Sequence, residues 1–120
     1  DGDAAARHVD AILALDFLDV HAIRARRFKV AVDYCRGAGT VILPLLLERL
    51  GCEVTAIHPE PDGRFPRPPE PVAENLGELE ALTREAGADV GFAVDPDVDR
   101  LALVDERGRA VGEDYTLALA

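Results

Sequence analysis

The sequence has few aromatic residues and no tryptophan: aromatic side chains make up 5% of the 120 residues, as four Phe and two Tyr. Hydrophobic residues still reach 48%, which is too many for a disordered chain and enough for a compact core. That core must therefore be aliphatic. A chain of this length suits one compact domain, and we expect residues 1–120 to form a single domain.

Basic residues are scarce as well. The chain has 13 Lys and Arg against 23 Asp and Glu, which gives a formal net charge of −10. Nucleic acids and anionic membrane surfaces are bound by basic faces, so the charge argues against both kinds of partner. Most of the acidic residues are expected simply to keep the chain soluble.

Cysteine and long apolar runs are also rare. Cys35 and Cys52 lack metal-ligand spacing, and free thiols in a reducing compartment are the simplest interpretation. There is no signal peptide and no apolar run near the roughly 18 residues of a membrane helix. We therefore expect a soluble cytoplasmic protein. Because the chain starts at Asp1, lacks Met and ends without a helix stop signal, we expect a segment of a larger protein.

Hydrophobic periodicity predicts helices that alternate with strands. Helices are expected over residues 3–18, 40–50 and about 75–87, with a short helical turn within 19–27, and strands over 28–33, 52–57, 88–94 and 101–105. In the first helix the buried stripe should contain Val9, Ile12, Leu13 and Phe17. Pro44 should lie in the first turn of its helix, and Asn75 with Glu78 should form a capping box.

This order predicts an α/β fold. Alternating strands and helices favour a parallel sheet with helices on both faces. Only residues 95–100 join the third and fourth strands, whereas a parallel connection needs about a dozen residues. We therefore expect a three-layer α/β/α sandwich with a small mixed four-stranded sheet, in which the last strand is antiparallel.

The most informative segment is the acidic loop between these two strands. Asp95, Asp97 and Asp99 occupy alternate positions, and Arg100 follows directly. A fold that gathers three like charges usually needs a cation to neutralise them, and an all-oxygen ligand set suits magnesium, calcium or manganese. Arg100 cannot ligate a metal but could bind a second anion such as phosphate. A metal beside an arginine is a setting for phosphoryl transfer.

The predicted topology places other polar residues near this loop. Asp33, His58 and Asp95 each follow or end a parallel strand, and ligands of open α/β sheets collect at that edge. A lone histidine such as His58 more often makes a structural hydrogen bond than it contacts a ligand. Residues 36–40 (Arg-Gly-Ala-Gly-Thr) could hold phosphate on backbone amides, but they lack a complete phosphate-binding motif, and such glycines more often make a tight turn.

Several alternatives compete with a magnesium site. The loop could be a solvated acidic turn. An EF-hand is rejected because position 6 is Arg100 rather than glycine and the flanking segments are strands. Asp95 or Asp97 could also serve as an aspartate nucleophile, as in phosphatases. The chain could finally be a metal-binding or interaction module without any catalytic role.

Four segments occur in an order that resembles a known family. They are Phe28-Lys-Val-Ala-Val-Asp-Tyr-Cys-Arg-Gly-Ala-Gly39, Pro61-Asp-Gly-Arg-Phe-Pro66, Glu74-Asn-Leu76 and Asp95-Pro-Asp-Val-Asp-Arg100. Together they resemble the second domain of the α-D-phosphohexomutases, the phosphoglucomutase and phosphomannomutase family. The resemblance covers nearly the whole chain and implies an α/β/α domain with a mixed four-stranded sheet.

The resemblance also implies a function. Asp95, Asp97 and Asp99 would hold Mg²⁺ against a phosphoserine, and Arg100 would position the phosphate or the sugar. The whole enzyme would move phosphate between the 1- and 6-positions of a hexose through a bisphosphorylated intermediate. The commoner form of the loop has glycines in place of Pro96 and Val98, and Arg36 replaces a frequent asparagine.

The chemistry would then be shared with other domains of the parent chain. In the family these domains supply the serine nucleophile, the sugar-selecting loop and the phosphate-binding loop. The 120 residues contain no serine. The resemblance therefore implies that this chain alone holds the metal and catalyses nothing.

Overall fold

A four-stranded mixed sheet forms the middle layer of the chain, in the order β2-β1-β3-β4. The computed structural model describes residues 2–119. The strands are β1 (Lys29–Asp33), β2 (Glu53–Ile57), β3 (Val90–Val94) and β4 (Leu101–Val104). β1 pairs in parallel with both β2 and β3, and β3 pairs antiparallel with β4. The predicted mixed sheet with an antiparallel last strand is therefore confirmed.

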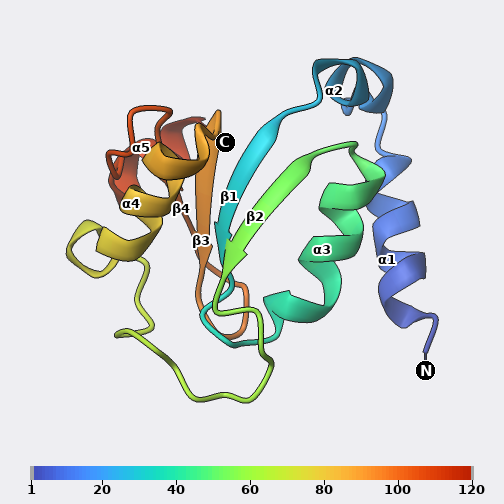
Figure 1. Cartoon of the computed structure of the whole chain (residues 1–120). Coiled ribbons are helices and arrows are strands. Elements are labelled where there is room, and N and C mark those ends of the chain that lie inside the picture. The colour runs from blue at the N-terminus through green and yellow to red at the C-terminus, as the bar shows by residue number, and fades with distance from the viewer. Residues whose placement is uncertain (1, 120) are drawn as a thin grey trace.

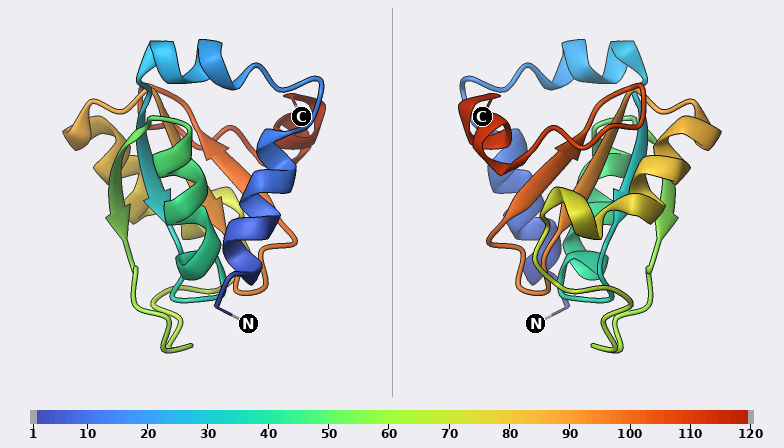
Figure 2. Two further views of the ribbon diagram at one scale, coloured as in Figure 1. Left: turned by 90° about the vertical axis from the view of Figure 1, so that its right-hand side faces the viewer. Right: turned by 90° about the vertical axis from the view of Figure 1, so that its left-hand side faces the viewer.

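Helices cover both faces of this sheet (Figure 1). α3 (Gly39–Arg49) lies on one face, and α1 (Ala4–Leu13) packs against α3. α4 (Gly77–Ala86) and α5 (Glu113–Leu119) lie on the other face, while α2 (Val20–Arg26) precedes β1 at one end of the sheet (Figure 2). The predicted three-layer α/β/α arrangement is confirmed. Among residues 2–119, no helix has the length and apolar character that crossing a membrane requires.

The core is mainly aliphatic, with the buried Tyr34 as an aromatic member, and it is divided by the sheet. Successive side chains of a strand point to opposite faces, and β1 sends the buried Ala31 to one side and the buried Val30 and Val32 to the other. On the α4 side, Ala31 packs in a cluster with Leu79. Burying such side chains supplies most of the driving force for folding, so both helix layers are held by apolar contact.

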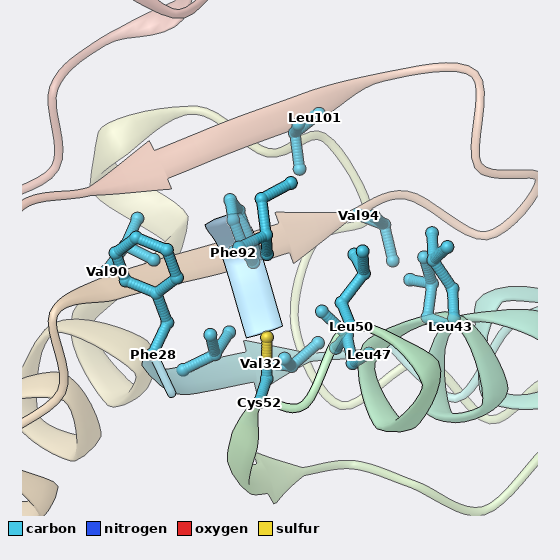
Figure 3. A pocket seen from close by; sticks show the side chains of 13 residues that line it. Phe28, Val32, Leu43, Leu47, Leu50, Cys52, Val90, Phe92, Val94 and Leu101 are labelled. Carbon is cyan, nitrogen blue, oxygen red and sulfur yellow. The ribbon is translucent and has the colours of Figure 1, made fainter. Parts of the chain in front are cut away.

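A cavity of about 430 Å³ lies between α3 and the sheet. Its lining is apolar, and the Cys52 sulfur is its one non-carbon side-chain group (Figure 3). The lining includes Phe28, Leu43, Phe92 and Leu101. No lining side chain could orient a phosphate or a sugar, because both need several polar partners. The polar chemistry must be sought at the edge of the sheet.

The first helix is shorter than predicted. It ends at Leu13 instead of extending to residue 18, and Phe17 is 84% exposed rather than part of the buried stripe. Asp19 explains the early end, because its side chain accepts a hydrogen bond from the backbone of Ala22 and caps a separate helix, α2. The chain must turn before that cap, so the helical spacing from Val9 is lost before Phe17.

Pro44 is not in the first turn of its helix, as predicted, but is the sixth residue of α3. A proline there cannot donate the hydrogen bond that the Thr40 carbonyl would otherwise accept. Pro44 faces solvent, so the cost of the lost bond is lower than it would be in the core. Gly51 and Gly87 follow α3 and α4 with φ of 72° and 61°, as the predicted helix ends require.

The predicted capping box is wrong. Asn75 belongs to a short 3₁₀ helix, η1 (Ala73–Asn75), and its side-chain amide donates to the Glu70 carbonyl at 2.9 Å. α4 begins only at Gly77, without a side-chain cap. The Asn75 amide therefore closes the proline-rich segment, residues 58–71, instead of starting the helix.

Candidate metal centre

The acidic loop emerges at the carboxyl edge of the parallel strands. Residues 95–100 join β3 to β4, and Asp33 and His58 stand at the ends of the neighbouring strands β1 and β2. The topology thus brings together the three chain positions that the sequence assigned to this edge. This is where an open α/β sheet binds its ligands.

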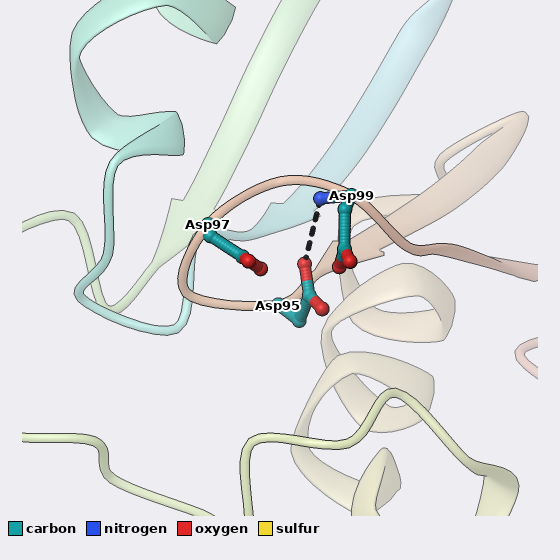
Figure 4. A group of neighbouring side chains, drawn as sticks. All are labelled: Asp95, Asp97 and Asp99. Atoms are coloured by element: carbon teal, nitrogen blue, oxygen red, sulfur yellow. Dashed lines mark hydrogen bonds between the residues drawn. The ribbon is translucent and has the colours of Figure 1, made fainter.

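The three aspartates form one cluster (Figure 4). One carboxylate oxygen from each of Asp95, Asp97 and Asp99 lies within 4.8 Å of the other two. Asp95 is fully buried, whereas Asp97 and Asp99 are exposed. An ion from solvent could therefore reach the exposed carboxylates of Asp97 and Asp99 directly, whereas the carboxylate of Asp95 lies inside the protein.

Hydrogen bonds hold Asp95 in place. Its Oδ1 accepts from the backbone amides of Asp99 and Arg100 at 3.1 and 3.2 Å. Its Oδ2 accepts from Arg100 Nε at 2.8 Å. A buried carboxylate bonded in this way is preorganised, and it closes the loop on itself because all of its partners lie four or five residues further along.

The loop turns tightly at its first four residues. The Val98 amide donates to the Asp95 carbonyl at 3.1 Å, with Pro96 at the second position of the turn, which its fixed φ favours. Val98 has a φ of 62°, a conformation that costs a β-branched residue about 1–2 kcal/mol and glycine almost nothing. Glycine at position 98 would therefore take this backbone angle without that cost.

A second loop supports the acidic loop from the side. The Ala38 amide donates to the Pro96 carbonyl at 2.8 Å. A Cβ on Gly37 would lie 2.6 Å from both the Cα and the carbonyl oxygen of Pro96, so only glycine fits there. The sequence had suggested a tight turn or a phosphate cradle at residues 36–40. The amides of residues 37, 38 and 40 already donate to backbone carbonyls, which favours the turn.

The carboxylates of the cluster have different pKa values. Burial opposes ionisation of Asp95, but hydrogen bonds from Asp99 and from the side chain and backbone of Arg100 outweigh it and lower the pKa. The hydrogen bond with Asp95, then desolvation and the charges of Asp95 and Asp97, raise the pKa of Asp99 to about 6. The carboxylates therefore repel one another, and a cation would relieve that repulsion.

The arginine next to the cluster has capacity for another anion. Arg100 Nε bonds Asp95 and lies 3.7 Å from an oxygen of Asp99, and half of its side chain is exposed. Three carboxylates offer only hard oxygen donors, which fit Mg²⁺, Mn²⁺ or Ca²⁺. The cluster could therefore hold a divalent ion, with a guanidinium beside it for phosphate.

Asp33 and His58 have a structural role at this edge. His58 Nδ1 lies 2.9 Å from Asp33 Oδ1, and its Nε2 lies 3.2 Å from Glu78. Arg67 Nε donates to Asp33 Oδ2 at 2.6 Å. The expectation of a structural hydrogen bond for His58 is confirmed. Arg67 was missed, because nothing in a proline-rich segment signals that an arginine will fold back into the protein.

Comparison with known proteins supports the structural picture. Residues 6–108 match the family model described as phosphoglucomutase/phosphomannomutase, alpha/beta/alpha domain II. The chain belongs to this family.

Both cysteines are free thiols in the structure, as predicted.

Individual members of the family give the same result. A phosphoglucomutase/phosphomannomutase of Thermococcus kodakarensis is 48% identical over 103 residues, which are 85% of this chain and 23% of the relative. A Methanosarcina barkeri protein named "Probable phosphoglucosamine mutase" is 42% identical over 120 residues, 99% of this chain and 26% of the relative. The crystal structure of a family member from Burkholderia thailandensis superimposes with a TM-score of 0.78 at 33% identity, covering 96% of this chain and 24% of that one.

These matches define what the chain represents. It spans about a quarter of the length of the relatives that it matches. The names of these relatives are all those of mutases, but they differ in the sugar. Membership in the family therefore identifies domain II and leaves the substrate open.

Proposed function

We propose that this chain is the metal-holding domain of a cytoplasmic phosphohexomutase, an intramolecular phosphotransferase that interconverts hexose 1-phosphate and hexose 6-phosphate. Asp95, Asp97 and Asp99 would hold Mg²⁺, and Arg100 would bind the phosphate or the sugar. The cluster of three carboxylate oxygens within 4.8 Å of one another is the observation that carries the proposal. Its position beside Arg100 at the ligand-binding edge of the sheet supports it.

When bound, the ion would stabilise negative charge on a phosphate group. The chain's own residues prepare that function. Asp95 stays fixed by its hydrogen bonds, and Arg100 is oriented by its bond to Asp95 while half of its side chain remains exposed. An arginine held in this way would interact with a phosphate without having to move as negative charge develops.

The aspartate nucleophile is the weaker alternative. Both oxygens of Asp95 accept hydrogen bonds and its side chain is fully buried, which disfavours Asp95 as a nucleophile. The exposed Asp97 lies within 4.8 Å of the two other carboxylates, whose negative charge would repel a phosphate unless a cation were bound. The 120 residues also contain no serine. We therefore expect the other domains of the parent enzyme to provide the phosphoserine and most of the sugar contacts.

The proposal is tested by Asp97→Asn. In the intact enzyme we expect this substitution to abolish mutase activity, because one ligand charge is lost. In the 120-residue chain we expect Mg²⁺ affinity, measured by calorimetry, to fall at least about tenfold. Stability without metal should stay the same or rise, because a repulsive charge is removed.

The control is Asp62→Asn, since Asp62 lies in the exposed proline-rich segment and pairs with Arg36 rather than with the cluster. This variant should bind Mg²⁺ like the wild-type chain. If Asp97→Asn instead unfolds the chain, the cluster is structural and the proposal is wrong. Mutase turnover by the wild-type 120-residue chain would contradict the expectation that it is inactive alone.

A further inference from the structure

Arg67 is a buried arginine that joins three separate segments. Only 7% of its side chain is exposed. Nε donates to Asp33 Oδ2 at 2.6 Å, and Nη1 donates to the carbonyls of Pro68 and Pro69 at 3.0 and 3.2 Å. Nη2 donates to the Val94 carbonyl at 3.1 Å. One guanidinium thus links the end of β1, the proline-rich segment and the last residue of β3.

Asp33 provides the fixed end of this connection. Its side chain is 1% exposed and belongs to a central strand. It accepts from the Cys35 amide at 2.9 Å and lies 2.9 Å from His58 Nδ1, in addition to its bond with Arg67. A buried charge pair with this many partners is costly to break from one side. The position of the Arg67 guanidinium is therefore set by the sheet and not by the loop that carries it.

The Val94 carbonyl is the point where this fixed group meets the acidic loop. Val94 directly precedes Asp95, and the peptide bond between them is planar. A hydrogen bond that fixes the Val94 carbonyl therefore also fixes the Cα of Asp95, to which the Asp95 side chain is attached. The Asp95 carboxylate in turn accepts hydrogen bonds from the backbone amides of Asp99 and Arg100. A displacement at Val94 would pass through Asp95 to the rest of the loop.

We propose that Arg67 is a positioning residue for the acidic loop: through the Val94 carbonyl it sets the place of Asp95 and hence the spacing of the three carboxylates. The part of this inference that concerns metal rests on the proposed function. The part that concerns the loop does not. Ligand sites tolerate errors of only about 0.5 Å, so losing this one contact should weaken metal binding in a chain that stays folded.

The first measurement is amide hydrogen exchange of the metal-free 120-residue chain. Arg67→Lys keeps the positive charge, but a single ammonium group cannot span Asp33 and three carbonyls as the guanidinium does. We expect the amides of Val98, Asp99 and Arg100 to exchange about tenfold faster, the factor expected for losing one hydrogen bond to a charged group. The amides of Val30 and Val32 in β1 should keep wild-type rates.

Arg64→Met is the matched control. Arg64 is exposed on the same proline-rich segment, and its removal should leave every one of these exchange rates unchanged. Wild-type rates at residues 98–100 in Arg67→Lys would overturn the proposal. Equal acceleration in β1 and in the loop, or a variant that does not fold, would also overturn it, because Arg67 would then stabilise the fold as a whole.

The second measurement is Mn²⁺ affinity, followed by the electron paramagnetic resonance signal of the free ion. We expect Arg67→Lys to bind Mn²⁺ about tenfold more weakly than the wild-type chain, and Arg64→Met to bind it equally well. Unchanged affinity in Arg67→Lys would contradict the inference alone. Absence of Mn²⁺ binding by the wild-type chain would contradict the proposed function, while the exchange result would still decide the role of Arg67.

Discussion

Gly37→Ala is the substitution that tests most directly how the acidic loop is held. It adds one methyl group at the closest approach between the loop after β1 and the loop after β3. The φ of Gly37 lies outside the left-handed region, so alanine fits the backbone and the effect is purely steric. The added Cβ would lie 2.6 Å from the Cα and the carbonyl oxygen of Pro96 and 3.0 Å from its carbonyl carbon.

The size of the effect follows from these distances. Ordinary contacts of a Cβ begin at 3.4 Å, so the Pro96 backbone must move by about 0.8 Å, more than the roughly 0.5 Å that a preorganised site tolerates. The atoms in the way are backbone atoms, which cannot rotate aside. Overpacking of this kind costs about 1–3 kcal/mol. Because Pro96 lies between Asp95 and Asp97, we also expect metal affinity to fall by at least about tenfold.

Two assays measure these effects separately. Urea unfolding followed by far-ultraviolet circular dichroism gives the free energy of unfolding, and calorimetric titration with Mg²⁺ gives the affinity. The matched control is Gly77→Ala at the start of α4, where an added Cβ has no atom within 4 Å. That variant should gain about 0.4–1 kcal/mol and bind metal normally. A Gly37→Ala chain with wild-type stability and affinity would refute this account of the loop.

Three further outcomes are expected. The folded-state pKa of Asp99 is raised from 3.8 to about 6, so its contribution to metal-free stability is full below about pH 4 and is lost as the pH rises through 6. Asp99→Asn should therefore raise the free energy of unfolding of the metal-free chain, measured in urea, above pH 6 but not below pH 4. An equal effect of the substitution in both pH ranges would contradict the raised pKa of Asp99. Leu79→Ala, at a fully buried core position, should lower the free energy of unfolding by about 2–5 kcal/mol without changing Mg²⁺ affinity in calorimetry at a temperature where the variant is folded. Pro44→Ala should raise the melting temperature, because the second turn of α3 regains a hydrogen bond worth about 1 kcal/mol; an unchanged or lower value would indicate a strained helix.

The strand order and the position of the acidic loop could be predicted because they depend on local patterns and on a length limit. Short apolar runs bounded by glycine, proline or charge mark all four strands. The six residues between β3 and β4 are too few for a crossover helix, so the antiparallel pairing follows from chain length alone. The same reasoning placed Asp95, Asp97 and Asp99 at the carboxyl edge of the sheet.

Element ends were predicted less well because they depend on competing hydrogen bonds. The apolar spacing from Val9 to Phe17 suits a longer helix, but Asp19 caps a new one nearby, and Phe17 is left in solvent. Asn75 has the sequence of a helix cap, yet its amide bonds Glu70 instead. Side chains that can satisfy either of two backbone segments choose between them only when the fold brings both within reach.

By itself, the sequence determined which groups carry charge, where strands and helices occur, and that three carboxylates would lie beside one arginine. These features follow from residue type and spacing over a few positions. Only the tertiary structure decided that Asp95 is buried and fixed, that Val98 takes a left-handed φ, and that Gly37 and Arg67 support the loop from other segments. The physical reason is that burial and hydrogen bonding between residues distant in sequence depend on how the layers pack, which no local pattern contains.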